Sequence, residues 1–413
     1  MQQSRLESGR RRYWVAFWVA MLFVIGSSFQ RFPITVGSAN LYIPHLIAIA
    51  FFPVFLHNDR VASGVRTVSL CFMAIAAVSI LPSMTLTSPD VRLSFLLQIV
   101  LNAFTMVVAL SVFRQLPLSA LRRLTVVVSW TLLTASLVQL VLVPGLNPRG
   151  ETTFGLPHPI LFFNEETWLA MFASLLCAAS LGVGARRTGL FLAILVFFIG
   201  TRSAMIVCGC AMLMSFESIA ERKWIRVLCI AVPAAFSAWF VFDAVFATGD
   251  RIYNDSLDTR TGDISAVRQA NNDHFLPFGG DVLSVFDFSR SRQVPSTSNV
   301  QGFELYWKFG LGGLLIVATF AFLVAWLLPK TVLKDPSVPV WPIWVSLMIW
   351  PAMLQFNNAF GFSWMWILLA LCLACMGTLN SENGGSGGLR SRMSSFEASN
   401  RVRSSRSTSR RYR

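Results

Sequence analysis

The sequence has few charged residues for its length. Asp, Glu, Lys and Arg make up only 13% of the 413 residues, whereas a soluble protein carries about 25%. Hydrophobic residues make up 54%, and they are spread along nearly the whole chain instead of forming one anchor. The shortage of charge therefore excludes a soluble protein and a soluble domain on a single anchor, and it predicts a polytopic membrane protein.

Motifs for nucleotides and metals are also missing. The chain has no GxxxxGK(S/T) phosphate loop, no HExxH sequence, no dinucleotide fingerprint and no convincing internal repeat. ATP hydrolysis is therefore not expected, and no cofactor is predicted. No metal site is predicted either, because the longer loops lack a DxD-like motif.

The cysteines do not indicate disulfides. All seven lie within apolar segments, where neither a disulfide framework nor an exposed thiolate site is expected. Cys372 and Cys375 form a CxxC sequence, but no second pair of ligands accompanies it. A redox or zinc-binding role is therefore not predicted.

Twelve apolar runs are predicted to be transmembrane helices. About 20 apolar residues are needed to cross roughly 30 Å of hydrocarbon, since a helix rises about 1.5 Å per residue. The first run follows three arginines as in a signal peptide, but no small-residue cleavage site follows it, so it is interpreted as a retained helix. The predicted fold class is therefore an all-α polytopic membrane protein. The runs are 13–29, 41–56, 67–81, 93–113, 124–143, 167–185, 188–201, 203–220, 225–247, 303–328, 338–356 and 361–379.

The orientation follows from the distribution of Lys and Arg. Cytoplasmic loops are enriched in these residues, and the twelve-helix arrangement collects most of them on one side. Both termini are therefore predicted to be cytoplasmic, and the net charge of +14 is interpreted as a topology signal, so no nucleic-acid partner is expected. A single span over 188–220 would reverse everything downstream and place the basic tail outside. Two helices separated at residues 200–203, by a tight outer turn or a helix break, fit the charges better.

This topology divides the chain into a transmembrane domain, residues 1–379, and a tail, residues 380–413. The outer face carries two sizeable loops, 144–166 and 248–302, where aqueous chemistry can take place. The tail is rich in Ser, Gly and Arg and has almost no apolar residues to bury. It is predicted to be disordered, cytoplasmic and able to lie on anionic lipid.

Arg202 is the sharpest candidate for a binding role. It follows Gly200 and Thr201 and precedes Ser203, at the predicted start of a helix. A guanidinium in this position can bind a phosphate bidentately, while neighbouring backbone N–H groups point the same way. The alternative is an arginine that reaches from the helix end to the membrane surface.

Histidines and one carboxylate are candidates for proton transfer. His158 and His274 are the histidines of the outer loops, and each could act as a general base near neutral pH or serve as a surface hydrogen-bonding group. Glu304 and Lys308 are four residues apart on a predicted helix, so they can pair. They form either an interfacial salt bridge or a site with the carboxylate facing a substrate cavity. Second candidates are Asp243, Glu165 and Glu166, while Gln98 and Asn102 are expected to cross-link helices and His45 and His57 to be structural.

With this topology, three segments together resemble the O-antigen ligase and O-antigen polymerase superfamily of bacterial membrane glycosyltransferases. Thr201-Arg202-Ser203-Ala204 is similar to the family's arginine motif, and Phe163-Asn164-Glu165-Glu166 is similar to its loop-to-helix transition. Ser298-Asn299, followed by Glu304 and Gly310-Leu311-Gly312-Gly313, is similar to its His-Asn pattern ahead of a helix rich in Glu and Gly. This sequence differs at Ser298, where many members have histidine.

The resemblance implies transfer of a polyprenyl-pyrophosphate-linked glycan to an acceptor sugar at the periplasmic face of the bacterial inner membrane. The displacement would be inverting and independent of metal. Arg202 would hold the pyrophosphate. A second clamp would come from Arg268, Arg290 or Arg292, and Asn299 and Lys308 would also bind substrate. Because Ser298 replaces the histidine, the base would be His274, His158 or Glu304.

Three functions are compatible with these features. Polymerisation of oligosaccharide repeat units into a surface or exported polysaccharide is preferred, because the histidine is missing. Ligation of the glycan to lipid A core is the alternative within the superfamily, and a transporter or flippase for lipid-linked sugars is the alternative of another class. Transporters keep their polar groups near the bilayer midplane, whereas here these groups gather at the outer rim. The expected partners are the lipid-linked donor, the glycan acceptor, membrane lipids, and chain-length regulator or export proteins.

Overall fold

The computed structural model describes most of the apolar segments of the chain. The described residues are 2–29, 33–36, 39–55, 60–85, 89–142, 159–163, 166–246, 276–280, 284–287, 292–295, 301–333, 340–354 and 361–379. The tail, 380–413, and most of the two long loops lie outside them.

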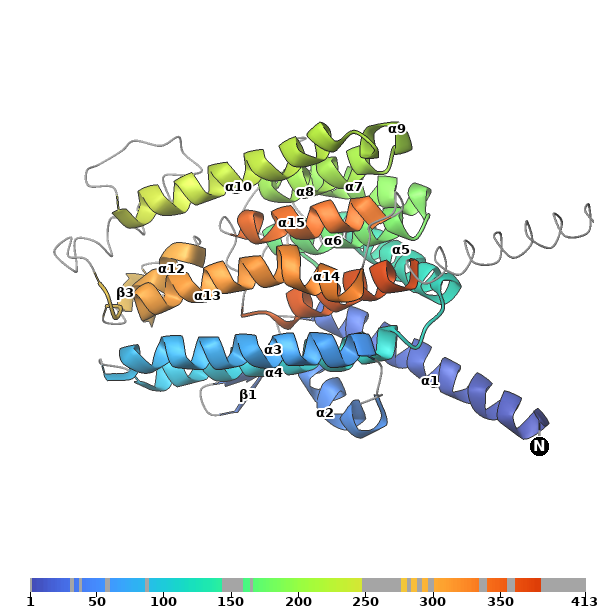
Figure 1. Ribbon diagram of the computed structural model, residues 1–413, viewed down its shortest axis with the longest axis horizontal. Coiled ribbons are helices and arrows are strands. Elements are labelled where there is room, and N and C mark those ends of the chain that lie inside the picture. The colour runs from blue at the N-terminus through green and yellow to red at the C-terminus, as the bar shows by residue number, and fades with distance from the viewer. Residues whose placement is uncertain are drawn as a thin grey trace, which may run out of the picture.

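The described chain is predominantly helical, which confirms the predicted all-α class. The helices run side by side along the long axis of the molecule (Figure 1). They are α1 (Gln2–Ser27), α2 (Ile43–Phe55), α3 (Arg60–Ile80), the short 3-10 helix η1 (Leu81–Thr85), α4 (Pro89–Phe113), α5 (Leu118–Leu142), α6 (Glu166–Gly182), α7 (Arg186–Ile199), α8 (Arg202–Met214), α9 (Glu217–Ala220), α10 (Lys223–Phe246), α12 (Gln301–Phe309), α13 (Leu311–Phe322), the π-helical turn η3 (Leu323–Leu327), α14 (Leu328–Val332), α15 (Trp341–Leu354) and a final helix, Ser363–Leu379.

Two short antiparallel strand pairs accompany the helices. β1 (Ile34–Val36) pairs with β2 (Ala39–Leu41), and Ile34 lies opposite Leu41. β3 (Ser284–Asp287) pairs with β4 (Arg292–Pro295), and Asp287 lies opposite Arg292. The second pair belongs to the large predicted loop, which therefore carries some local structure of its own.

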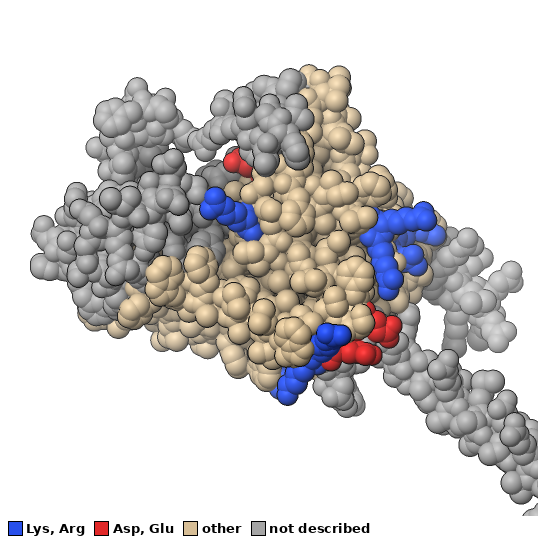
Figure 2. All heavy atoms as spheres, turned by 90° about the horizontal axis from the view of Figure 1, so that it is seen from above, with Lys and Arg blue, Asp and Glu red and all other residues tan. Residues whose placement is uncertain are grey.

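The protein has helices that are long and apolar enough to cross a membrane. Four meet this standard by length and composition: Ser63–Met84, Arg92–Phe113, Leu118–Leu142 and Leu311–Val332. Six shorter apolar helices of 10–17 residues accompany them in the described chain. Figure 2 shows a broad uncharged area between the charged patches on one face of the molecule. The fold is therefore that of a helical membrane protein, while the number of twelve crossings stays a prediction.

The two ends of the bundle differ in the segments they collect. The N-terminus of α1 and the red C-terminal helix point toward one end, whereas α12 and β3 lie at the other (Figure 1). The start of the chain and the structured parts of the large loop are thus at opposite ends of the bundle. Which side of a membrane each end faces stays a prediction.

The structure tests the predicted helix boundaries at three breaks in particular. The break predicted near residues 200–203 is confirmed, because α7 ends at Ile199 and α8 begins at Arg202. The single helix predicted over 303–328 is wrong, because Gly310 adopts φ 61° and ψ −139° between α12 and α13. The single helix predicted over 203–220 is also wrong, since Phe216 adopts an extended conformation between α8 and α9.

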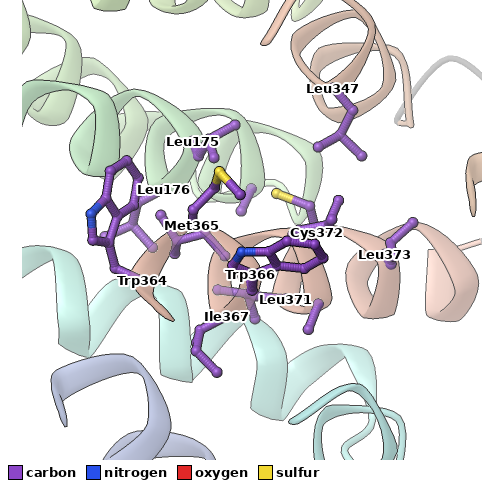
Figure 3. Packing of buried hydrophobic residues seen from close by; sticks show 14 of the residues in the cluster. Leu175, Leu176, Leu347, Trp364, Met365, Trp366, Ile367, Leu371, Cys372 and Leu373 are labelled. Carbon is purple, nitrogen blue, oxygen red and sulfur yellow. The ribbon is translucent and has the colours of Figure 1, made fainter. Parts of the chain in front are cut away.

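The helix Ser363–Leu379 forms the centre of the hydrophobic core. Every side chain from Trp364 to Met376 is at most 1% exposed, as expected of a helix that is hydrophobic on all sides. In Figure 3, Met365 and Cys372 project toward the side where Leu175 of α6 and Leu347 of α15 lie, while other side chains point the opposite way. This helix is therefore surrounded by protein on all sides.

A buried polar network links α4 to two other segments. The backbone N–H of Tyr42 donates to Nδ1 of His45 at 3.1 Å, so the Nε2 of His45 carries the proton that is donated to Oδ1 of Asn102 at 2.8 Å. The Asn102 amide in turn donates to the carbonyl of Gly361 at 3.1 Å. The predicted cross-linking role of Asn102 is confirmed, and His45 is used in structural hydrogen bonds.

Candidate functional site

The candidate site is built around the sharp connection between α12 and α13. This connection, here called the α12–α13 junction, comprises residues 304–313, the segment 276–280 that packs on it, and Arg92 of α4. It lies at the end of the bundle away from the N-terminus, where Figure 1 places α12 and β3. Three backbones meet here, and the sequence supplies glycine where they meet.

Glycines let the backbones approach closely at the junction. An ideal Cβ on Gly310 would lie 2.2 Å from the carbonyl oxygen of Pro277, and one on Gly312 would lie 2.0 Å from that of Ser79 at the end of α3. One on Gly313 would lie 1.9 Å from the carbonyl oxygen of Leu305 in α12. Real Cβ atoms do not reach these distances, so the three glycines are required for the start of α13 to approach the segment 276–280, α3 and α12 this closely.

The segment 276–280 is attached to the junction by backbone hydrogen bonds. The N–H of Gly280 donates to the carbonyl of Trp307 at 2.7 Å, and the N–H of Leu311 donates to that of Pro277 at 3.0 Å. The N–H of Leu276 donates to the hydroxyl of Tyr306 at 3.0 Å. These bonds fix one part of the large predicted loop on the helices that follow it.

Arg92 adds a charged attachment from α4. Its side chain is only 1% exposed. One guanidinium nitrogen donates to the carbonyl of Ser83 in η1, and the other donates to the carbonyl of Gly280 at 2.9 Å. Arg92 therefore joins α4, η1 and the large loop, and sequence reasoning missed it. The available signal was its position, because it is among the minority of cations that the topology assigns to the outer face.

Glu304 and Lys308 form the ion pair that their spacing predicts. Both lie on α12, their charged groups are in contact, and Glu304 is only 5% exposed. A buried carboxylate beside an ammonium group offers a proton acceptor and a cation within one turn of helix. The salt bridge is confirmed, and a substrate cavity facing the carboxylate stays a prediction.

Arg202 begins α8 immediately after the break that ends α7. Gly200 ends α7 in the left-handed conformation, with φ 80° and ψ 12°, and Thr201 is extended. Arg202 is exposed, and within the described part of the chain its guanidinium has no hydrogen-bond or ion-pair partner. An exposed guanidinium beside the backbone N–H groups of a helix start is a suitable arrangement for an anion.

The structure describes only some of the other predicted site residues. Arg292 begins β4, and its register partner is Asp287. Within the described residues, no group of three or more His, Cys, Asp and Glu side chains could hold a metal ion. The predicted residues outside the described chain are His57, His158, Glu165, Arg268, His274, Arg290, Ser298 and Asn299.

Removing Arg92 is expected to loosen the junction. Arg92→Met deletes two hydrogen bonds from a charged donor, each contributing about 1.5–3 kcal/mol, and leaves the carbonyl of Gly280 without that donor. We expect a lower midpoint of thermal unfolding in detergent and faster protease cleavage near residue 280. Arg92→Lys should have a stability between those of the wild type and Arg92→Met, since one ammonium group replaces a planar fork. Arg123→Met, at an exposed position of α5, is the control, and equal behaviour of the two methionine variants would contradict the role of Arg92.

Comparison with known proteins does not identify a family. No family model matches the chain, and no curated protein matches it. The resemblance to O-antigen ligases and polymerases therefore rests on the short motifs in the sequence.

Proposed function

We propose that the protein polymerises polyprenyl-pyrophosphate-linked oligosaccharide repeat units at the periplasmic face of a bacterial inner membrane. The observation that carries this proposal is Arg202, an exposed guanidinium without a partner among the described residues, at the start of α8 directly after the Gly200 break. A pyrophosphate can accept hydrogen bonds from a bidentate guanidinium and from helix N–H groups at the same time.

The α12–α13 junction gives the proposal a second support. A transporter is expected to hold its polar groups near the bilayer midplane. Here the Glu304–Lys308 pair lies in the first helix after the large loop, beside the attached segment 276–280. An attached loop segment and an ion pair at one end of the bundle therefore favour an enzyme that acts on a substrate at the membrane surface over a transporter.

The proposed reaction is a displacement at the anomeric carbon of the donor sugar. A hydroxyl of the acceptor sugar attacks this carbon, the new glycosidic bond forms, and the bond to the pyrophosphate oxygen breaks. The polyprenyl pyrophosphate leaves with its charge held by Arg202, together with Arg268, Arg290 or Arg292. The hydroxyl proton passes to a base, for which His274, His158 and Glu304 are the candidates, while Asn299 and Lys308 bind substrate.

The location of His274 in the sequence makes it the first choice for the base. It precedes Leu276 by two positions, and Leu276 is hydrogen-bonded to Tyr306 of α12. General-base catalysis raises the reaction rate about 10²- to 10⁴-fold.

Ligation to lipid A core is the second candidate function, and it differs from polymerisation only in the acceptor.

The test is an assay of purified protein with lipid-linked repeat units. Polymerisation predicts a ladder of longer lipid-linked products from repeat units alone, whereas ligation predicts a product only when lipid A core is added. His274→Ala, His158→Ala and Glu304→Gln are compared, and loss of about 10²-fold or more in rate identifies the base. Normal ladders from both histidine variants, with loss only in Glu304→Gln, would assign the base to the carboxylate. No product with either acceptor, from folded wild-type protein, would contradict the proposal.

A further inference from the structure

The end of α3 away from the junction holds an arginine whose donors lack partners. The side chain of Arg66 is half-buried, and its Nε and Nη2 atoms are buried without a hydrogen-bond acceptor in the described chain. These two atoms form one edge of the planar guanidinium, which pairs bidentately with a carboxylate or a phosphate. A buried charged donor without a partner is costly, so this edge favours an anionic ligand.

A second donor without a partner lies on the same face. Ser69 is 2% exposed, and its Oγ has no hydrogen-bond partner in the described residues. Residues three positions apart are neighbours on a helix surface, so Arg66 and Ser69 face the same surroundings. Two independent donors therefore lack acceptors within one turn of α3.

The side of α3 that carries Gly64 packs against α14. An ideal Cβ on Gly64 would lie 3.8 Å from the Cβ of Thr331, so this part of α3 packs against the last turn of α14.

Other cations surround the last turn of α14. The Nζ of Lys330 lies 3.8 Å from the centroid of the Trp326 ring. The guanidinium of Arg114 lies beside Gly377, close to Val332, as the positions around an ideal Cβ on Gly377 show. With Arg66, these side chains make this end of the bundle positively charged, which attracts an anion before any direct contact forms.

The surface next to Arg66 is apolar and exposed. Leu70, one turn further along α3, is 56% exposed, and Val78 is 67% exposed. Leu70 is four positions from Arg66 and therefore continues the same side of the helix. The unpaired guanidinium edge of Arg66 matches the phosphate group of a lipid. The exposed apolar side chains further along α3 match its acyl chain.

We propose that Arg66, supported by Ser69, binds the phosphate group of an anionic membrane lipid whose acyl chain lies along Leu70. This site is separate from the α12–α13 junction. Arg66 is 14 residues before Ile80, where α3 ends beside η1, and this distance corresponds to about 21 Å of helix. The lipid would bind to α3 at the end of the bundle opposite the junction, and the proposal does not depend on the proposed glycan chemistry.

The experiment measures lipid binding to the full-length protein in detergent by native mass spectrometry. Dioleoyl phosphatidylglycerol is the test lipid, and dioleoylglycerol, which has the same chains without phosphate, is its control. Arg66→Gln is expected to weaken phosphatidylglycerol binding roughly tenfold or more, because it removes charge-assisted hydrogen bonds. Arg66→Lys should recover part of the affinity, and Ser69→Ala should have a smaller effect. Arg187→Gln, at an exposed arginine of α7, should leave binding unchanged.

Three results would overturn the proposal. The first is equal phosphatidylglycerol affinity of Arg66→Gln and the wild type. The second is dioleoylglycerol binding as strong as that of phosphatidylglycerol. The third is stabilisation of the wild type by sodium phosphate alone, equal to that by the lipid, which would replace the lipid with a soluble anion. If Arg66→Gln does not yield folded protein, Arg66→Lys and Ser69→Ala carry the comparison, and unchanged affinity in both then overturns the proposal.

Discussion

Alanine at Gly310, Gly312 or Gly313 is expected to disrupt the α12–α13 junction and to lower the stability of the whole bundle. Each added methyl group would lie between 1.9 and 2.2 Å from a backbone carbonyl oxygen, and backbone cannot rotate away as a side chain can. Overpacking costs about 1–3 kcal/mol when side chains can adjust. At Gly310 the positive φ adds about 1–3 kcal/mol for a residue with a Cβ, so Gly310→Ala should have the largest effect.

The measurement is thermal unfolding of the purified variants in detergent, with size-exclusion chromatography as a check on folding. Gly209→Ala is the matched control, because Gly209 lies in α8 and an ideal Cβ there has nothing within 4 Å. This control should be neutral or stabilising by about 0.5–1 kcal/mol, since alanine is the better helix former. If Gly312→Ala unfolds at the same temperature as Gly209→Ala, the close approach of α3 to α13 is absent from the protein.

The positions of most helices could be predicted from the sequence because long apolar runs leave few alternatives. A run such as 93–113 must be a helix in a membrane, where every backbone polar group has to be hydrogen-bonded within the segment, and α4 covers it. The break at Gly310 could not be predicted in this way. The residues on both sides are apolar, and the break depends on the carbonyl of Pro277, which lies far earlier in the sequence.

The candidate site was predictable only where it is local. Glu304 and Lys308 are one helical turn apart, so their pairing follows from spacing alone. The break before Arg202 follows from a glycine and a short polar stretch between two apolar runs. Arg92 was missed because one of its two acceptors, Gly280, is 188 positions away. A sequence read without related sequences does not show contacts of this kind.

Arg202→Ala is expected to abolish glycan transfer while the protein still inserts and folds. This result rests on the proposed function, in which the guanidinium holds the leaving pyrophosphate. The side chain is exposed, so its removal leaves no cavity and exposes no buried partner among the described residues. Two charge-assisted hydrogen bonds to the pyrophosphate contribute about 1.5–3 kcal/mol each. Their loss corresponds to a fall in rate of roughly 10²- to 10⁴-fold, since about 1.4 kcal/mol is tenfold.

A matched control separates this role from a simple helix-start effect. Arg186 is the first residue of α7 just as Arg202 is the first residue of α8, and both are exposed. Arg186→Ala should keep normal product ladders, while Arg202→Lys should keep only part of the activity because a point charge cannot replace a planar fork. Rates are compared at equal amounts of monodisperse protein and over a range of donor concentrations. An arginine that only reaches the membrane surface predicts full activity for Arg202→Ala, whereas one that binds the pyrophosphate predicts a loss that added donor does not restore, because the contact strengthens as charge develops on the leaving group.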